Sequence, residues 1–378
     1  MIKRISALIL ALIFICMIIT GCGAQTAGDT PETPGTATIQ NKPEKTPGAS
    51  AAENESEEPP STTATQASDE LGVQAYEYLS YIDENLHDRD CIDGDNYMQS
   101  RQWILRELQK AGYSKNDIHT EDFTFENESD DGDAQSVDQQ NIWVTKKGTS
   151  GRQIIIGAHY DGTGTGDNGS GTALALAAAA EFCNAEPFYD LTFVFFSAEE
   201  YGLYGSAAYA ADMSPEQIEN TEYMINMDSI LSGDYCYIYG GAADFDELTV
   251  NDTQAYEIAM QTARELGLRI RSNPWTFSRP EPSAEDGVPA YPSPATGDWS
   301  DHVAFRDLGI PYVYFEATNW EIGDFDGYDE TEDAGPIIHT ENDNLEAIES
   351  FFPGRAQENI NTFAALLEAL LEQGDLEF

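Results

Sequence analysis

The sequence predicts an α/β protein, built as a single α/β/α sandwich around a mixed and mainly parallel central sheet. Two observations support this fold class. Short apolar runs alternate with segments of helical apolar spacing, and polar residues follow several of the apolar runs directly. Strands that alternate with helices usually form a parallel sheet with helices on both faces. The 378 residues suffice for a large core and show no internal repeat, so one folded domain is expected.

The elements can be placed in order along the chain. Residues 76–82 and 97–111 have helical spacing, and Gly112 stands where a helix C-cap is expected. Strands are predicted at 141–145, 153–157, 191–196, 223–227, 235–239 and 311–315, and further helices at 172–185, 255–266 and 359–371.

The N-terminus has the pattern of a bacterial secretory signal. Lys3 and Arg4 precede an apolar run at 5–19, which is shorter than the roughly 20 residues of a membrane-spanning helix. A small residue, Gly21, comes directly before Cys22, as in a lipobox. We therefore expect residues 1–21 to be removed and Cys22 to carry a lipid that anchors the protein to the extracytoplasmic face of the cell membrane. The alternative is an ordinary signal peptide with an incidental cysteine.

Composition separates a tether from a folded domain. The range 22–69 is rich in Thr, Pro, Ala, Glu, Gly and Ser and nearly free of aromatic residues, so it is expected to be a disordered tether. The catalytic domain is then predicted to span 70–378.

Charge and cysteine usage exclude several classes. With 68 acidic and 18 basic residues the formal charge is −50, which argues against nucleic acid as a partner. After removal of the signal and lipidation of Cys22, the cysteines Cys91, Cys183 and Cys236 remain, without CxxC spacing. Neither a disulfide framework nor a thiolate zinc site is expected.

Seven acidic and histidine residues lie where apolar runs give way to loops: His159, Asp161, Asp167, Glu199, Glu200, Asp228 and His339. Side chains at the ends of neighbouring parallel strands converge, so these residues can share a site. Imidazole and carboxylate ligands suit zinc, and a pair of ions needs one shared carboxylate. Singly, each residue has an ordinary structural explanation, such as a turn or a helix start.

The motifs that contain these residues resemble those of the zinc aminopeptidases of peptidase family M28, from about residue 75 to the C-terminus. The segments, in order, are 159–161, 166–171, 197–202, 226–228, 300–302 and 339–340. The resemblance implies a zinc-dependent exopeptidase-like fold and two Zn²⁺ ions. It implies that His159 and Asp228 hold one ion, that Glu200 and His339 hold the other, and that Asp167 bridges both.

The resemblance also implies a reaction. Asp161 would orient the imidazole of His159, and Glu199 would be the general base for a hydroxide shared by the two ions. The expected activity is removal of N-terminal residues from peptides that have a free N-terminus. Asp301 is expected to support the site or the substrate, with a helix-start pair of Asp301 and His302 as the alternative.

Some positions depart from the family pattern or lie beside it. Ile338 stands where some members have a Tyr, whose role could pass to Tyr291 or Tyr201. Asp343 is expected to cap a helix that begins near Leu345. The acidic loop 324–333 is expected to be solvated, because it lacks the ligand spacing of an EF-hand calcium loop.

Other functions remain open. A glutaminyl cyclase shares this fold with one zinc, but that class favours Trp at the position of Ile338. A carboxypeptidase or dipeptidase needs a cationic clamp, for which Arg279 and Arg306 are candidates. A non-catalytic peptide-binding lipoprotein would have no need of Glu199. Side-chain preference, oligomeric state and the metal used in the cell do not follow from the sequence.

Overall fold

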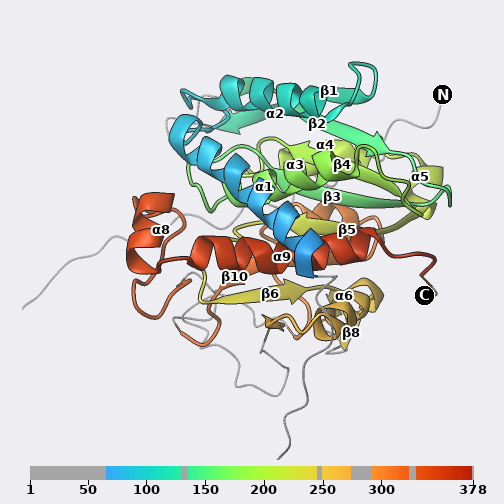
Figure 1. The fold of residues 1–378 in the computed structure, drawn as a ribbon. Helices are drawn as coiled ribbons and strands as arrows, with labels where there is room; N and C mark the ends of the chain where they lie inside the picture. Colours follow the sequence, from blue (N-terminus) through green and yellow to red (C-terminus); the bar gives the residue numbers. More distant parts are fainter. Residues whose placement is uncertain (1–64, 129–133, 245–248, 274–291, 323–328, 377–378) are drawn as a thin grey trace, which may run out of the picture. The chain divides into compact units, whose positions relative to one another are not determined.

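The central element is an eight-stranded sheet with the strand order β1-β2-β4-β3-β5-β10-β6-β9 (Figure 1). The computed structural model describes residues 65–128, 134–244, 249–273, 292–322 and 329–376. The strands are β1 (Ile118–Glu128), β2 (Ala134–Lys146), β3 (Gln153–His159), β4 (Asp190–Phe196), β5 (Thr221–Met227), β6 (Tyr235–Tyr239), β9 (Ile270–Arg271) and β10 (Tyr312–Thr318). The four central strands are parallel, while β2 and β6 join them antiparallel. The predicted mixed, mainly parallel sheet is confirmed.

Helices cover both faces of this sheet. One face packs against α1 (Thr65–Asn85), α2 (Tyr97–Ala111), α3 (Gly169–Phe182), α6 (Gln254–Glu265) and α9 (Arg355–Leu371). The other face packs against α4 (Tyr204–Asp212), α5 (Pro215–Glu219) and α7 (His302–Arg306). The short α8 (Leu345–Phe351) contacts α9, and β7 (Ala242–Asp244) pairs with β8 (Thr249–Asn251). This is the α/β/α sandwich that the sequence predicts.

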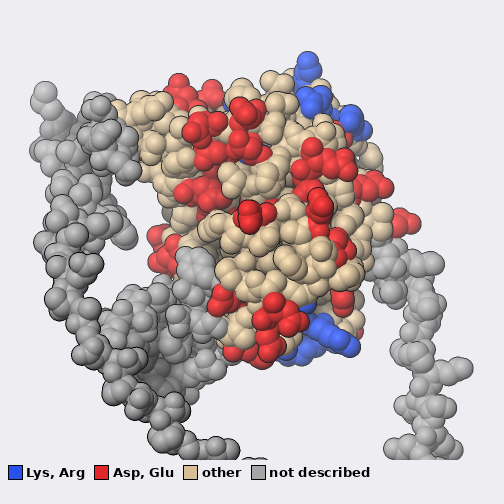
Figure 2. Space-filling view, turned by 90° about the vertical axis from the view of Figure 1, so that its left-hand side faces the viewer, with Lys and Arg blue, Asp and Glu red and all other residues tan. Residues whose placement is uncertain are grey.

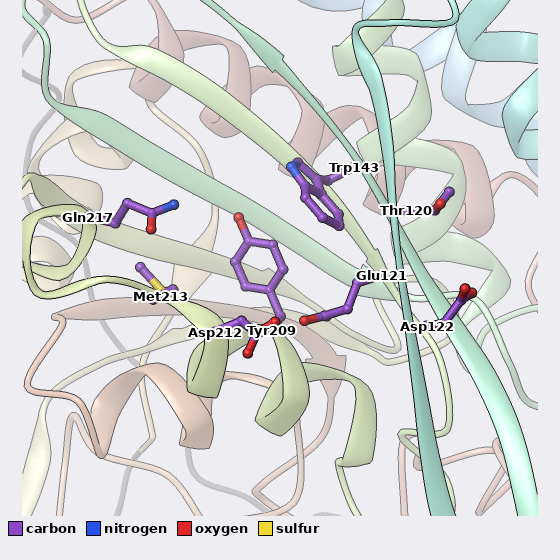
Figure 3. Close-up of a pocket in the computed structure, with 8 residues that line it drawn as sticks. All are labelled: Thr120, Glu121, Asp122, Trp143, Tyr209, Asp212, Met213 and Gln217. Carbon is purple, nitrogen blue, oxygen red and sulfur yellow. The ribbon is translucent and has the colours of Figure 1, made fainter.

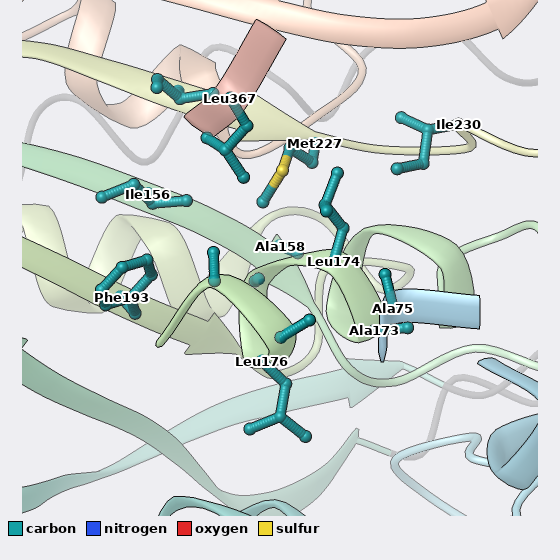
Figure 4. Packing of buried hydrophobic residues seen from close by; sticks show 14 of the residues in the cluster. Ala75, Ile156, Ala158, Ala173, Leu174, Leu176, Phe193, Met227, Ile230 and Leu367 are labelled. Carbon is teal, nitrogen blue, oxygen red and sulfur yellow. The ribbon is translucent and has the colours of Figure 1, made fainter. Parts of the chain in front are cut away.

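The core explains why the central strands are so apolar. Ile154 and Ile156 of β3 face the α3 side, and Ile155 between them faces the opposite cluster, all without solvent exposure. The alanine-rich α3 lies directly on the sheet (Figure 4). Each large aliphatic side chain buried this way contributes about 1.5–3 kcal/mol. A strand buried on both faces thereby gives the site at its end a rigid support.

Several element boundaries differ from the prediction. The helix α3 begins at Gly169 and not at 172, because the side chain of Asn168 caps it by accepting the N–H of Gly171. The long edge strand β1 and the helices α4 and α5 were not predicted, since their exposed positions interrupt the apolar pattern. The helix α1 begins at Thr65, so the last five residues of the range 22–69 are helical and not tether.

The predicted signal 1–21, the lipidated Cys22 and the tether as far as residue 64 lie outside the described residues. Within the described ranges, none of the helices combines the length and the apolar character needed to cross a membrane. Cys91, Cys183 and Cys236 are all free thiols. Acidic side chains are scattered over the face of the molecule in Figure 2, and Lys and Arg gather at two places on its margin.

Candidate metal centre

Three neighbouring parallel strands bring the predicted residues to one edge of the sheet. His159 is the last residue of β3, Glu199 and Glu200 follow the end of β4, and Asp228 follows β5 directly. The carboxyl ends of parallel strands meet at the same edge, which is where ligands bind in open α/β sheets. The structure therefore places together residues that are up to 69 positions apart in this part of the chain.

His159 lies at the centre of the first group of potential ligands. Its Nε2 atom is 3.3 Å from Oδ1 of Asp228, 3.4 Å from Oδ1 of Asp167 and 3.8 Å from Oε2 of Glu199. Each of these four residues is more than nine-tenths buried. One nitrogen thus faces three carboxylates in a space from which bulk water is largely excluded.

Asp167 stands between two histidines. Its Oδ1 atom faces His159, while its Oδ2 atom lies 2.9 Å from Nε2 of His339. The same nitrogen of His339 is 3.8 Å from Oε2 of Glu200. Asp167 is therefore the carboxylate whose two oxygens point toward two different sets of ligands.

Two sets of side chains have donor atoms close enough to share one cation. The first is His159, Glu199 and Asp228, and the second is His159, Asp167 and Glu200, with the atoms of each set within 4.8 Å of one another. His339 extends the second set through its contacts with Asp167 and Glu200. Nitrogen and oxygen donors in this proportion fit zinc.

The pKa values show how much negative charge this site concentrates. Burial raises the pKa of Glu199 well above its ordinary value, and nearby carboxylates such as Asp228 add to that shift. Burial and Asp167 raise the pKa of Glu200 to about 7. Burial would lower the pKa of His159, but Glu199 and Asp228 outweigh it and raise that pKa. Without a metal the site must hold protons, and a divalent cation would compensate the same charge.

Asp161 lies behind this group and is fully buried. Its Oδ1 atom accepts the backbone N–H of Glu199 at 3.3 Å and lies 3.7 Å from Nδ1 of His159. The second distance is longer than a hydrogen bond. Among the described residues, neither Nδ1 of His159 nor Oδ2 of Asp161 has a hydrogen-bond partner. Asp161 thus faces the imidazole as expected and also fixes the turn that presents Glu199.

The loop that presents Asp167 is held by Asp343, which the sequence had assigned to a helix cap. That assignment is wrong, because the cap of α8 is Asn344, whose side chain accepts the N–H of Ala347. Asp343 instead accepts the N–H of Gly166 at 2.6 Å and that of Asp167 at 3.1 Å. A side chain at Gly164 would place its Cβ 1.8 Å from Oδ2 of Asp343, so glycine is required for this approach.

Arg89 also holds the loop that presents Asp167, although no sequence motif pointed to Arg89. Arg89 is 1% exposed, and its guanidinium donates to the carbonyls of Tyr160 at 3.1 Å and of Gly164 at 2.6 Å. Its backbone N–H donates to the carbonyl of Gly162 at 2.8 Å. The nearest sequence signal would have been an arginine seven residues after the helix predicted at 76–82, which alone indicates nothing about a metal site.

Three residues at the site have left-handed backbones that non-glycine residues seldom adopt. They are Ala198 with φ 57°, Ser229 with φ 52° and His339 with φ 57°. Such conformations cost on the order of 1–3 kcal/mol each and cluster at functional sites. These left-handed residues change the direction of the backbone where Glu199, Asp228 and the imidazole of His339 come together.

The structure distinguishes Asp301 from His302. Burial raises the pKa of Asp301 to about 7, and the charge of His159 is the largest effect that lowers it, so Asp301 lies within electrostatic reach of the site. His302 instead lies between the rings of Tyr312 and Tyr314, at 4.5 and 5.1 Å, and belongs to neither set of ligands. The serine before them, Ser300, donates to Oδ2 of Asp228 at 2.7 Å.

The sequence also singled out Tyr291, Tyr201, Arg279 and Arg306 beside the site, and the structure describes two of these four residues. Tyr291 and Arg279 lie outside the described residues. The hydroxyl of Tyr201 donates to Asp90 at 2.8 Å, and Arg306 pairs with Asp298 and Asp307. Of the acidic loop 324–333, residues 324–328 lie outside the described residues. Glu330 is 1% exposed and accepts the N–H of Ile337, whereas Glu332 and Asp333 are exposed as expected.

A sheet-edge site of buried histidine and carboxylate ligands in an α/β/α sandwich defines a metal-dependent hydrolase. The family model for peptidase family M28 matches residues 141–364, so the chain belongs to this family of zinc-dependent metallopeptidases. A curated relative, the alkaline phosphatase isozyme conversion protein of Escherichia coli (strain K12), is 26% identical over 302 residues, which are 73% of this chain and 83% of the relative.

Solved structures share the fold. An aminopeptidase from Aneurinibacillus sp. strain AM-1 matches with a TM-score of 0.59 at 15% identity, over 83% of this chain and 98% of its own. A zinc aminopeptidase from Bacillus subtilis matches with a TM-score of 0.57 at 17% identity, over 81% and 96%. A glutaminyl cyclase from an Acidobacteriales bacterium matches with a TM-score of 0.54 at 17% identity, over 86% and 100%.

Proposed function

We propose that this protein is an aminopeptidase with two zinc ions that removes N-terminal residues from peptides. The observation that carries the proposal is the position of Asp167. Its two oxygens face His159 and His339 separately, which is the arrangement that a carboxylate bridging two ions requires. His159 and Asp228 would hold one ion, and Glu200 and His339 the other.

Zinc, when bound, supplies Lewis acidity toward the scissile carbonyl and lowers the pKa of water at the site. The protein's own contribution to proton transfer is Glu199. Its carboxyl lies 3.8 Å from Nε2 of His159 and its backbone N–H is held by Asp161. Glu199 accepts a proton from the attacking water and returns it to the nitrogen of the leaving amine, which restores the carboxylate.

The charge of the site supports attack at the amino end of a peptide. Five carboxylates, those of Asp161, Asp167, Glu199, Glu200 and Asp228, lie around His159. Two zinc ions would compensate most of this charge but not all of it, and a free α-ammonium group is attracted to the negative charge that remains. A carboxypeptidase would need a cation for the substrate carboxylate. The candidate Arg306 is already paired with two aspartates, Asp298 and Asp307.

A glutaminyl cyclase with one zinc is the competing function, because structures of that class share the fold. The position before the last histidine is Ile338 and not the Trp that such cyclases favour. Zinc stoichiometry and products therefore decide between the two functions.

The test uses the full chain and Glu199→Gln, with Glu216→Gln on the exposed surface as the matched control. Each protein is offered unblocked peptides, their N-acetylated forms and a peptide with N-terminal glutamine, and its zinc content is measured. We expect two zincs per chain, release of amino acids from unblocked peptides only, and a loss of about 10²–10⁴-fold in kcat for Glu199→Gln alone. One zinc with cyclised product, or full activity in Glu199→Gln, would overturn the proposal.

We further propose that lipid on Cys22 holds the enzyme at the extracytoplasmic face of the membrane. The support is the sequence pattern of residues 1–22, with its basic start, short apolar run and small residue before the cysteine. Membrane fractions should contain the wild-type chain, and Cys22→Ser should move it to the soluble extracytoplasmic fraction. An unchanged distribution of Cys22→Ser would contradict lipid anchoring.

A further inference from the structure

A pocket of about 440 Å³ lies on the sheet face that α4 and α5 cover, and none of the proposed metal ligands lines it. Its walls include Glu121, Asp122 and Asp212 and no Lys or Arg. The carboxyl of Asp122 accepts the amide of Gln140 and points away from the aromatic wall, so Glu121 and Asp212 supply the negative charge (Figure 3). Trp143, Tyr209 and Met213 form the apolar part of the wall. The pocket is thus both anionic and aromatic.

The carboxyl of Glu121 is fixed in place. Its Oε2 atom accepts the amide of Asn141 at 2.8 Å, and Asn141 is fully buried. Figure 3 shows the carboxyl groups of Glu121 and Asp212 directed toward one another. Burial, and then the neighbouring Asp212, raise the pKa of Glu121. Two carboxyls held close together without a cation between them form a site that a positive charge would stabilise.

The aromatic wall is equally well ordered. Trp143 stacks on His119 with ring centroids 5.4 Å apart and meets Tyr209 edge-on at 5.5 Å. Tyr209 is 9% exposed and reaches toward the pocket with its hydroxyl (Figure 3). This hydroxyl has no hydrogen-bond partner in the part of the chain that the structure describes. The hydroxyl lies at the opposite end of the ring from the carboxyls of Glu121 and Asp212, so the ring of Tyr209 separates a hydroxyl at one end of the pocket from two carboxyls at the other (Figure 3). A ligand that donates hydrogen bonds can reach either end along this ring.

The carboxylate and aromatic side chains of the pocket together indicate which class of ligand it binds. Calcium and magnesium take oxygen ligands and gain little from indole or phenol rings. An ammonium or guanidinium group on an aliphatic stem gains from both parts of the wall, because aromatic faces attract organic cations and carboxylates accept their hydrogen bonds.

The shape of the groove indicates which kind of molecule carries the cationic group. A second hollow of about 260 Å³ shares Trp143, Tyr209 and Gln217 with the first, so the groove continues past the aromatic wall. Its further walls carry Thr145, Gln153 and Thr192, whose polar groups suit a main chain. They also carry Glu216 and the ion pair of Lys147 with Asp190 at 2.7 Å. We propose that this groove binds the basic side chain, arginine or lysine, of a polypeptide. This site is separate from the metal centre and does not depend on the proposed peptidase activity.

The test measures binding to the full chain by calorimetry at 0.15 M salt, where charges more than about 8 Å apart are screened. The probe is Nα-acetyl-arginine amide, whose blocked amino group keeps it from being an aminopeptidase substrate. Nα-acetyl-citrulline amide is its neutral counterpart, and spermidine and calcium chloride represent other cations. The double variant Glu121→Gln with Asp212→Asn removes both charges of the facing carboxyl pair but keeps the acceptor for Asn141.

We expect the arginine probe to bind, the citrulline probe to fail, and the double variant to lose about tenfold in affinity. The control Glu126→Gln removes one charge from the same strand at an exposed position outside the pocket, and should leave the affinity unchanged. If the double variant does not fold, the single change Asp212→Asn, at an exposed residue, replaces it. Equal binding of citrulline, tighter binding of spermidine or calcium, no binding at all, or an equal loss in Glu126→Gln would each overturn the assignment.

Discussion

The carboxylate of Asp343 accepts the backbone N–H of Asp167 at 3.1 Å, across 176 positions of the chain. Asp343 also accepts the N–H of Gly166, and its own pKa is raised to about 7 by burial. The residue that faces both histidines is thus held through its backbone by an acidic side chain from a distant loop.

Asp343→Asn should therefore weaken zinc binding, because an amide offers only one acceptor oxygen to the two N–H groups. Loss of a residue that orients a metal ligand typically costs about 10–100-fold in metal affinity. Competition with a chromogenic chelator measures this affinity. The control is Glu341→Gln, which removes the charge of an exposed side chain two residues away. Equal zinc affinity in the two variants would show that Asp343 does not position Asp167.

Arg89→Met should destabilise the folded protein. The substitution leaves the buried carbonyls of Tyr160 and Gly164 without their donor, and unpaired buried groups cost roughly 1–3 kcal/mol each. We expect a loss of about 3 kcal/mol in the free energy of unfolding, measured with urea in the presence of chelator. Arg106→Met, at an exposed position of α2, should change it by less than about 0.5 kcal/mol. A similar effect of both changes would refute the role of Arg89 as a clamp.

The metal-free protein should show a pH-dependent contribution from His339. The hydrogen bond to Asp167 raises the pKa of His339 to about 9, above the ordinary histidine pKa of about 6.5. A raised folded-state pKa gives stability that is full below pH 6.5 and is lost as the pH rises through 9. The difference in unfolding free energy between wild type and His339→Gln should therefore shrink over this range in urea titrations with chelator. A difference that grows with pH would reverse the assigned sign.

Zinc and protons compete for the same imidazole, since only neutral histidine binds a metal. The zinc affinity of the wild type should consequently fall as the pH drops below 9, and this fall should be smaller in His339→Gln. Isothermal titration at several pH values measures both slopes, and parallel slopes would contradict the prediction.

Asp301 and His302 are adjacent but should respond differently. Asp301→Asn removes a buried carboxyl within electrostatic reach of His159, and we expect kcat to fall by about tenfold or more. His302→Phe replaces a neutral ring that lies between Tyr312 and Tyr314, so kcat should stay within about threefold. Steady-state kinetics on an unblocked peptide, with zinc content checked, separate the two. A larger effect of His302→Phe would contradict the assignment.

The centre of the fold was predictable because its strands are buried on both faces. The ranges 153–157 and 223–227 contain the apolar runs Ile154–Ile156 and Tyr223–Ile225, and both are strands of the parallel core. The edge strand β1 escaped prediction because residues such as His119 and Asp122 are exposed and pair only with β2. The residue pattern of β1 reflects pairing with one neighbouring strand, β2, and not burial in a core.

The site was predictable in its residues and not in its supports. Motifs that resemble those of family M28 selected His159, Asp167, Glu199 and the other candidates, and the structure places these residues together. Arg89 and Asp343 act on backbone atoms of distant residues, and no local pattern records such a contact. The left-handed backbones of Ala198 and Ser229 are likewise imposed by the packing around them.

The clamp formed by Arg89 also sets a lower limit on how far the enzyme can be shortened. The segment matched by the family model begins at residue 141, whereas Arg89 and the helix α1 that packs against α3 precede it. A fragment cut to 141–364 would lack both the guanidinium under the Gly162–Gly164 turn and the helical layer above α3. Any transplant of this catalytic unit into another protein must therefore carry the chain from α1 onward as a single inseparable module.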